Sequence, residues 1–462
     1  MLLKSLKGMH FMFTDNYPDS LKQLTEMCKE SYAINPKAFQ SANVKRGLRN
    51  FDGSGIVAGV TNIALVHGYI LYEGEKMPDE GRLLYRGYDV QNLIDAYTAE
   101  NRYGYEECAF LLLFGFLPTN EQLEAFRTLT NSYSFLPQNF TEDVIMRVPS
   151  ANIMNKMQSS VLSLYTYDSN PEDMSIENQL RQSMQLIARL PVIAAHAYSV
   201  KKHVFDQDSL LLHRPKEGLA TAQNFMRILG QDVSFDEDEA RLLDICLVLH
   251  AEHGGGNNSS FTCRTVTSAN TDIYSAIGAA IGSLKGPKHG GANIKVENMF
   301  SEIKENVRNW NDDDEVYAYL AKILRKEAGD GSGLIYGMGH AIYTKSDPRT
   351  VILKKNAASL AEKKGFKAEF DLLQKIEALS PAVFKEVRNN DKAMCANVDM
   401  YSGLIYRMLG IPAELYTPLF ASARVAGWCA HRIEELLTGG KIMRPAYKTI
   451  YNVKDYTSIA DR

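Results

Sequence analysis

The sequence has no run that approaches the ~20 consecutive apolar residues needed by a membrane-spanning helix. It also has no excess of one charge, because 51 Lys and Arg against 55 Asp and Glu leave a formal net charge of −4. That balance argues against broad binding to nucleic acid or anionic membranes, although it leaves room for a local basic pocket. The 462 residues, 45% hydrophobic and 23% charged, predict a globular protein with a sizeable core.

Cysteine is scarce and dispersed. None of the six cysteines forms a C-x-x-C pair, which argues against zinc ribbons and redox pairs. Dispersed cysteines in a large chain fit a reducing compartment. The chain start has no small-residue cleavage site, and Asp15 and Asp19 precede the first arginine, Arg46, whereas a transit peptide is rich in arginine and poor in acids. We therefore expect a cytoplasmic protein.

Helix signals dominate what is present. Thr119 and Gln122 form a potential capping box, and acidic residues 236–239 precede an apolar run that ends in glycines 254–256. Strand-like segments occur only early, at 61–74 and 81–88, and no regular β-α alternation follows. These patterns predict a mostly α protein and argue against a doubly wound sheet. No linker marks a boundary, so a second domain would be inserted into the first.

Two predicted helices have no polar face. Residues 242–250, LLDICLVLH, are apolar at nearly every position. Residues 273–284, IYSAIGAAIGSL, place small residues where another backbone can approach closely. The second helix therefore packs either tightly within the chain or at a subunit interface.

The segment HAEHGGGN, residues 250–257, holds two histidines on one helix face. It lacks the H-E-x-x-H spacing of metalloproteases, and no P-C-x-x-C follows as in zinc deaminases, so we expect no metal. His250 is predicted to be a hydrogen-bonded core histidine. His253 lies where the helix gives way to glycines, and a helix C-terminus favours imidazolium, so it is a candidate for holding an anion.

Two further segments place a titratable group among small residues. In GPKHGGAN, residues 286–293, glycines leave His289 open to solvent or substrate. In NVDMYSG, residues 397–403, Asp399 precedes a helix and is either a first-turn acid or a desolvated general base.

The segment GLIYGMGHAIYTKSDPRT, residues 333–350, sets His340 between glycines that offer it nothing to pack against. Ile342 stands where a dinucleotide loop needs its third glycine, so that reading is rejected. Residues 347–349, DPR, are expected to form a rigid turn that aims Arg349 at a carboxylate. Downstream, Arg424 and Arg444 are either surface charges or further anion ligands.

Taken together, the histidines, the aspartate and the arginines predict carbon–carbon bond formation. The arginines would hold a small polycarboxylate, and the aspartate would remove a proton from carbon. One histidine would hydrogen-bond the enolate oxygen, and the other would polarise an accepting carbonyl. No metal is required, and no G-x-S-x-G serine nucleophile is present.

The order and spacing of these segments resemble the active-site segments of the citrate synthase family. HAEHGGGN is similar to the family's substrate-histidine segment, and GYILYEG, GRLLYRGYDVQNLI and YEECAFLLLFGFLP are similar to its N-terminal pattern. The resemblance extends from about residue 48 to 445. It implies a mostly α homodimer with a large domain, 1–290 and 405–462, and a small mobile domain, 291–404, that closes over a cleft.

The resemblance also implies an activity: an acyltransferase that condenses acetyl-CoA with oxaloacetate and water to give citrate and CoA. This is the entry to the tricarboxylic acid cycle. Oxaloacetate would bind first, and the CoA thioester would be a substrate, so no cofactor is expected. The implied roles are the base for Asp399, the enolate donor for His289, the ketone donor for His340, and oxaloacetate binding for His253, Arg349, Arg424 and, from the partner subunit, Arg444.

The segments depart from the family pattern at Thr344, where many relatives carry a basic residue, and at Lys288, where an apolar residue is common. The residues that contact the CoA phosphates are therefore left unassigned. The alternatives are a 2-methylcitrate synthase that uses propionyl-CoA, a citryl-CoA cleavage module, and a non-catalytic helical dimer. No residue separates the two synthases. A citryl-CoA cleavage module would normally use a nucleotide, yet the sequence has no P-loop. A non-catalytic helical dimer would not require this set of histidines and aspartate.

Overall fold

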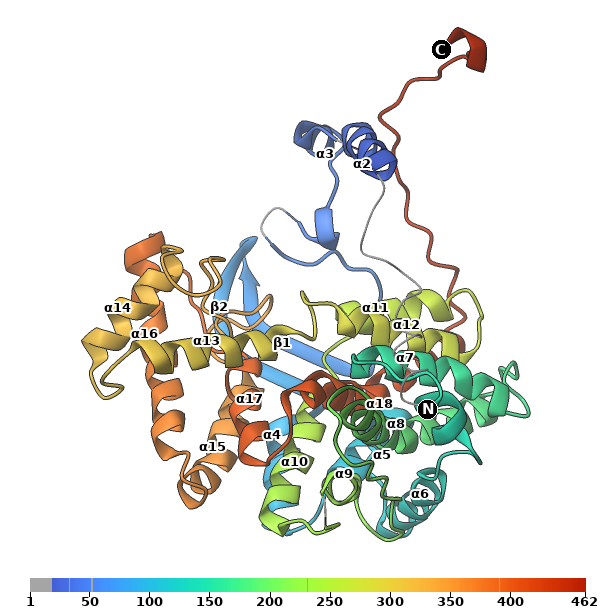
Figure 1. Cartoon of the computed structure of the whole chain (residues 1–462), viewed down its shortest axis with the longest axis vertical. Helices are drawn as coiled ribbons and strands as arrows, with labels where there is room; N and C mark the ends of the chain where they lie inside the picture. Colours follow the sequence, from blue (N-terminus) through green and yellow to red (C-terminus); the bar gives the residue numbers. More distant parts are fainter. Residues whose placement is uncertain (1–18, 33, 51–52, 231, 390) are drawn as a thin grey trace. The chain divides into compact units, whose positions relative to one another are not determined.

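The computed structural model describes residues 19–32, 34–50, 53–230, 232–389 and 391–462 (Figure 1). It divides into two compact units, one of residues 1–58 and 444–462 and the other of residues 59–443. The first unit holds helices α2 (Asp19–Ser31) and α3 (Pro36–Ser41) and 3-10 turns at Arg46–Leu48 and Ile459–Asp461. The N-terminal segment, from which a cytoplasmic location was predicted, lies mostly outside the described residues.

The second unit is built mainly of helices, which confirms the mostly α prediction. Its helices are α4 (Val90–Ala99), α5 (Tyr105–Phe114), α6 (Asn120–Tyr133), α7 (Ile153–Leu164), α8 (Ile176–Phe205), α9 (Thr221–Leu229), α10 (Glu237–His250), α11 (Asn258–Thr267), α12 (Ile273–Lys285), α13 (Ala292–Asn306), α14 (Asp313–Leu324), α15 (Pro348–Lys363), α16 (Lys367–Arg388), α17 (Asp399–Met408) and α18 (Tyr416–Leu437). Short turns at Thr141–Met146, Tyr165–Tyr167 and Ala413–Leu415 join some of them. The predicted division at 291–404 would lie within this unit and stays a prediction.

The polar residues at the helix ends act as the sequence predicts. Thr119 caps α6 through a hydrogen bond from the Gln122 backbone N–H (3.3 Å), and the Gln122 side chain accepts the Thr119 N–H in return (2.9 Å). Asp236 caps α10 in the same manner, and acidic residues fill the first turn of that helix. These side chains satisfy N–H groups that a helix leaves unpaired.

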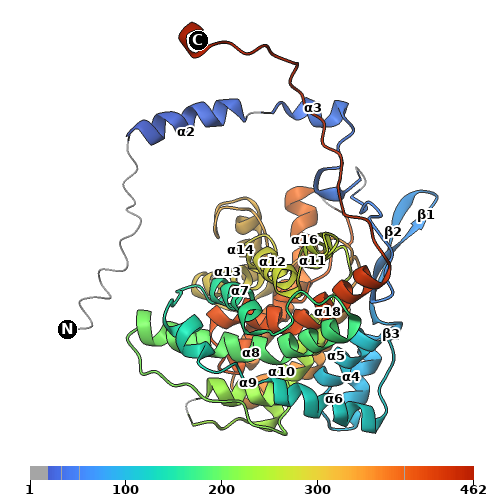
Figure 2. The same ribbon diagram turned by 90° about the vertical axis from the view of Figure 1, so that its right-hand side faces the viewer.

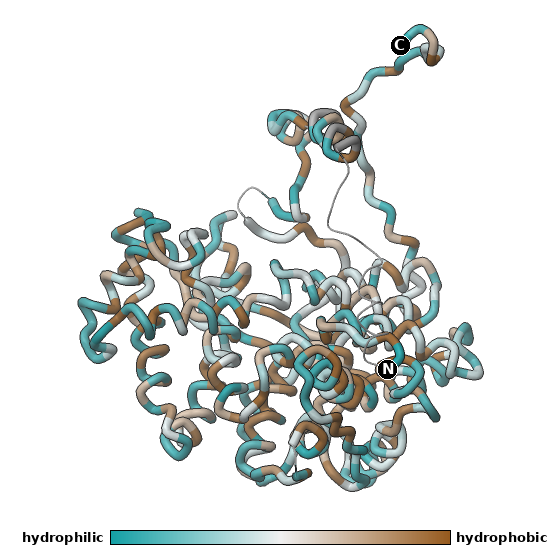
Figure 3. The backbone as a smooth tube through the Cα atoms, viewed as in Figure 1, coloured by the Kyte–Doolittle hydropathy of each residue, from teal (hydrophilic) through white to brown (hydrophobic). Residues whose placement is uncertain are grey.

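Helix α18 lies in the middle of the second unit, packed against α5, α8, α10, α11 and α12 (Figures 1 and 2). Its residues from Tyr416 to Ile433 are buried, apart from the half-buried Phe420, and Figure 3 shows the hydrophobic residues along it. Three ionisable side chains, Arg424, His431 and Arg432, are buried in the same helix. Because buried charges must be paired or completed by a ligand, α18 is where a binding site is expected.

The small residues of α12 serve packing within the chain. A Cβ atom at Gly278 would lie 3.1 Å from Leu162 Cδ2, and one at Gly282 would lie 2.6 Å from Gln158 Nε2, both on α7. The reading of this helix as tightly packed is therefore confirmed. A subunit interface there stays a prediction.

One antiparallel sheet accompanies the helices, with the order β1 (Ala64–Tyr72), β2 (Glu75–Tyr85), β3 (Tyr88–Asp89). Both predicted strand regions are confirmed, and β2 begins earlier than expected. The β1–β2 pairing shifts register between His67 and Tyr69. Across the described segments, no helix combines the length and apolarity that crossing a lipid bilayer would require.

Candidate active site

Helix packing brings together segments that lie far apart in the sequence. Helix α10 packs on α15 and α18, and α17 packs on α13 and α15. The ends of these helices carry the predicted groups: His253 just after α10, His289 just before α13, His340 before α15, and Asp399 at the start of α17. Arg444 is exposed and belongs to the other compact unit. Its role stays a prediction.

The loop of His340 is paired with the segment of Asp399. The Gly339 N–H donates to the Cys395 carbonyl, and the Asn397 N–H donates to the Gly337 carbonyl (both 2.8 Å). Gly337 has φ of +82°, and a Cβ there would lie 3.1 Å from Met400 Cα. The glycine therefore lets two chain segments approach closely, which brings the loop of His340 next to the segment that holds Asp399.

His340 is shielded, contrary to the expectation from its glycine neighbours. Its ring stacks on Tyr343 (centroids 4.6 Å apart, planes at 29°) and meets His253 edge-on at 5.2 Å. The backbone N–H groups of Ile342 (3.1 Å) and Tyr343 (3.2 Å) donate to His340 Nδ1. Because Nδ1 accepts, Nε2 carries the hydrogen of the neutral ring and can donate to a substrate.

Asp399 lies in the first turn of its helix, and its carboxyl is desolvated; its role as a general base stays a prediction. It is the first residue of α17, and its backbone N–H donates to Asn397 Oδ1 (3.0 Å). Burial raises the pKa of its carboxyl to about 6, although the nearby Arg349 guanidinium acts in the opposite direction. A carboxylate with such a pKa is ionised at neutral pH yet basic enough to take up a proton.

His289 is held by the cap of α11. Its Nε2 lies 3.1 Å from Asn257 Oδ1 and 3.1 Å from Ser259 Oγ, and Asn257 is the N-cap of that helix. Burial, with the nearby charge of Arg424, lowers the pKa of His289 to about 4. The ring is therefore neutral at pH 7 and cannot act as a cation.

The expectation of an imidazolium at His253 is wrong. Helix α10 ends at His250, before His253, and the ring is buried. Burial and then the Arg349 charge hold the pKa of His253 well below its usual range. Its Nε2 lies 3.2 Å from the Tyr343 hydroxyl. His253 thus offers a neutral hydrogen-bonding ring to the site.

The DPR segment is the start of a helix and not an isolated turn. Asp347 is the N-cap of α15, with Pro348 as its first residue. The Asp347 carboxylate receives two parallel hydrogen bonds from Arg349, from Nε (3.0 Å) and Nη2 (2.7 Å). The bidentate edge that was expected to bind a substrate is therefore occupied, which leaves the Nη1 side of Arg349 for a ligand.

Arg424 has the opposite environment. It is fully buried; its Nε donates to the His250 carbonyl (2.5 Å), and its guanidinium lies 4.6 Å from the centre of the Phe420 ring. Neither Nη1 nor Nη2 has a hydrogen-bond partner among the described residues. Burial lowers the pKa of Arg424 to about 10, so it remains charged at pH 7. A buried cation with two bare donors is costly unless an anion completes it.

His250 is buried, as expected, but its ring is not bonded in the way that was predicted. It packs on Phe420 with ring centres 4.4 Å apart, and its Nδ1 lacks a partner among the described residues. Its hydrogen bond to Arg424 is made by the backbone carbonyl. His250 therefore supports the arginine and does not approach the reacting groups.

The sequence interpretation missed a buried hydrogen bond between a histidine and a carboxylate. His431 and Glu252 are both fully buried, with Nε2 and Oε1 2.8 Å apart. Arg264 donates from Nε to His431 Nδ1 (3.1 Å), so the His431 hydrogen is on Nε2 and points to Glu252. The sequence did contain a signal for this contact, because His431 lies inside the apolar helix α18 and Glu252 precedes His253. Tyr343 was missed too, although it lies in a segment already singled out.

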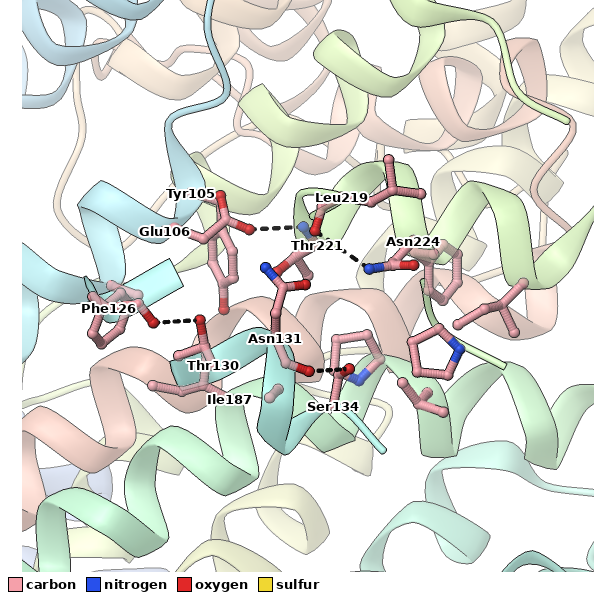
Figure 4. A pocket seen from close by; sticks show the side chains of 17 residues that line it. Tyr105, Glu106, Phe126, Thr130, Asn131, Ser134, Ile187, Leu219, Thr221 and Asn224 are labelled. Carbon is pink, nitrogen blue, oxygen red and sulfur yellow. Dashed lines mark hydrogen bonds between the residues drawn. The ribbon is translucent and has the colours of Figure 1, made fainter. Parts of the chain in front are cut away.

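Two hollows of the second unit are lined by other residues. One of about 30 Å³, room for little more than a water molecule, is enclosed by α5, α6, α8 and α9 (Figure 4). There Glu106 Oε1 accepts the Thr221 N–H (2.7 Å), and none of its described lining residues is a histidine or arginine. It lacks the groups for the predicted chemistry. Among the described residues no cluster of His, Cys, Asp and Glu is arranged to hold a metal ion.

Comparison with known proteins finds relatives over most of the chain. Residues 51–446 match the family model described as citrate synthase, C-terminal domain. The citrate synthase of Corynebacterium glutamicum is 33% identical over 405 residues, which cover 86% of this chain and 85% of that protein. The 2-methylcitrate synthase of Shewanella oneidensis is 32% identical over 382 residues, covering 82% and 90%. The crystal structure of citrate synthase from Pyrobaculum aerophilum superimposes with a TM-score of 0.72 at 28% identity, covering 88% and 94%.

The pKa of Asp399 predicts a pH-dependent stability. Because the folded-state pKa is about 6, above the ordinary aspartate value of 3.8, the carboxyl contributes stability at low pH that is lost as pH rises through 6. We expect Asp399→Asn to be more stable than the parent protein at pH 8, and this difference should shrink toward pH 4. Urea unfolding midpoints would measure it. The exposed Glu305→Gln is the matched control, and a pH-independent difference for Asp399→Asn contradicts the assignment.

Proposed function

The chain belongs to the citrate synthase family, and we propose that its buried Arg424 binds the oxaloacetate on which that family's reaction is carried out. The reaction condenses acetyl-CoA with oxaloacetate and water to give citrate and CoA. The enzyme is an acyltransferase that converts the acyl group into an alkyl group on transfer. The CoA thioester is consumed as a substrate.

One observation carries the assignment of Arg424. Its Nη1 and Nη2 are buried without a partner among the described residues, next to neutral His253 and to Arg349. A dicarboxylate supplies the missing acceptors and balances both cations, and a planar guanidinium suits a carboxylate in two parallel bonds. His253 and the Nη1 side of Arg349 complete the proposed oxaloacetate contacts.

Asp399 is proposed to remove a proton from the methyl carbon of acetyl-CoA. The electron pair of the broken C–H bond then makes the enolate, whose oxygen accepts a hydrogen bond from His289. Since Nε2 of His289 faces Asn257 and Ser259, the donor is Nδ1. This requires the Ser259 hydroxyl, which donates to Asn257 Oδ1 (2.9 Å), to rotate and donate to Nε2 instead. It also requires Asn257 Oδ1 to move away from Nε2, because an amide oxygen only accepts.

His340 is proposed to act on the other substrate. Its Nε2–H donates to the ketone oxygen of oxaloacetate, which makes the ketone carbon a better electrophile. The enolate carbon attacks that carbon, the new C–C bond forms, and the ketone oxygen takes the proton. Water then hydrolyses the thioester of the citryl-CoA product, which releases citrate and CoA.

Domain closure is proposed to protect the enolate from water. His340 and Asp399 lie within the proposed small domain, 291–404, while His253, His289 and Arg424 lie outside it. Closure after oxaloacetate binds would therefore complete the acetyl-CoA site, which favours ordered binding. We also propose a homodimer, located in the cytoplasm, in which Arg444 reaches the partner's oxaloacetate.

The activity is tested by release of free thiol when the protein is mixed with acetyl-CoA and oxaloacetate. We expect Asp399→Asn to fold and to lose at least about 10²-fold in kcat, because a general base has been removed. Absence of thiol release by the parent protein contradicts the activity. Full turnover by Asp399→Asn contradicts the role of the base.

Arg444→Ala tests the shared site. We expect a higher KM for oxaloacetate, while the exposed Lys448→Ala serves as the control. Mixing Arg444→Ala with Asp399→Asn subunits is more decisive: if Arg444 acts on the partner's site, each mixed dimer contains one intact site, and activity returns. No recovery in verified mixed dimers, or an unchanged KM, rules out the shared site.

The similarity to a 2-methylcitrate synthase makes propionyl-CoA the alternative acyl donor. One methylene changes specificity by only ~10–200-fold in a hydrophobic pocket. We expect a higher kcat/KM with acetyl-CoA than with propionyl-CoA, measured by the same thiol release. The reverse order would assign the chain to the 2-methylcitrate branch.

A further inference from the structure

The β1–β2 hairpin has an unusual bulge. His67 pairs with Arg82 and Tyr69 pairs with Pro78, so Asp79, Glu80 and Gly81 of β2 lie opposite the single residue Gly68 of β1. A bulge leaves backbone groups outside the ladder and often lies beside a functional site. In this hairpin those groups need partners from another part of the chain.

The loop that follows His340 supplies the partners. The Thr344 hydroxyl donates to the Gly68 carbonyl (2.5 Å) and accepts the Asp79 N–H (3.1 Å). The Ser346 hydroxyl accepts the Gly81 N–H (3.0 Å) and donates to the Glu80 carboxylate (2.5 Å). Two hydroxyl side chains thus take the place of strand partners and bind the loop to the bulge.

Glycine is required on the hairpin side of this contact. A Cβ at Gly68 would lie 2.6 Å from Tyr343 Cα and 2.7 Å from the Ile342 carbonyl oxygen. A Cβ at Gly81 would lie 2.1 Å from the Ser346 carbonyl oxygen. Both obstacles are backbone atoms, which cannot turn away, so a side chain at either position must displace the loop.

The contact reaches the catalytic ring through two residues. Ile342 and Tyr343, which press on Gly68, are the residues whose N–H groups hold His340 Nδ1 as an acceptor. We propose that the β1–β2 bulge and Thr344 are positioning elements for His340, fixing the loop so that the ring presents Nε2–H to substrate. This inference rests on the proposed function of His340. It also gives a role to Thr344, where many relatives carry a basic residue.

Two variants test the positioning role, each with its own control. Gly68→Ala should lower kcat by about 10²-fold, the effect of moving a reacting group by ~1 Å, with a smaller change in the KM for acetyl-CoA. Gly59→Ala, where a Cβ meets nothing within 4 Å, should behave as the parent protein. Thr344→Val removes both hydroxyl contacts and should lower kcat by about tenfold, and Thr344→Ser, which keeps the hydroxyl, should restore it.

A spectroscopic measurement separates positioning from loss of fold and from failure of the proposed reaction. In protein labelled with nitrogen-15 histidine, the two ring nitrogens of His340 report which one carries the hydrogen, and His340→Gln assigns their signals. We expect an unprotonated Nδ1 in the parent protein and a mixed tautomer population in Gly68→Ala and Thr344→Val. Folded variants with the parent's kcat and His340 signals would overturn the proposal. If the parent protein releases no thiol, the reaction is wrong, but the tautomer comparison still tests the positioning.

Discussion

The rest of the site depends on one constraint: Arg424 is a buried guanidinium whose two terminal nitrogens have no hydrogen-bond partner among the described residues. Arg424 makes one hydrogen bond through Nε, and its Nη1 and Nη2 find no acceptor among the described residues. Such a charge is tolerated where a ligand anion completes it. Burial and the nearby arginines also depress the pKa of His253 and His289. The site therefore presents cations and neutral rings together, which suits a dianionic substrate with a carbonyl to be polarised.

The buried Glu252 carboxylate helps Arg424 to stay charged although its guanidinium is buried. Glu252 acts to raise the pKa of Arg424 against the larger effect of burial. The carboxylate is held by His431, which Arg264 in turn orients. A Cβ at Gly427 would lie 2.1 Å from Glu252 Oε2, so α18 lacks a side chain where the carboxylate lies. Helix α18 thus supplies the buried cation Arg424, the hydrogen-bond donor His431 to Glu252 and, at Gly427, the room for that carboxylate.

The parts of this arrangement that depend on local pattern were predictable from the sequence. Capping residues such as Thr119 and Asp236 marked helix starts, whereas the glycines around His340 wrongly indicated an unshielded ring. What depends on tertiary packing was not predictable. The neutral state of His253 follows from its burial, which the residues next to it in the sequence do not indicate. The pairing of Asp347 with Arg349 follows from the helix that begins at Pro348. The stacking of Tyr343 on His340 required the loop conformation itself.

Neutral imidazoles make tautomers decisive, because each ring then has a single hydrogen to donate. At His340 the choice is made by two backbone N–H groups, which cannot rotate, so Nε2–H is set before any substrate arrives. At His289, Nε2 faces Asn257 Oδ1, which only accepts, and the Ser259 hydroxyl, which can rotate. The tautomer of His340, the proposed oxaloacetate donor, is therefore set in advance, whereas that of His289, the proposed enolate donor, depends on groups that can move. This difference matches a reaction in which oxaloacetate binds first and acetyl-CoA completes the site.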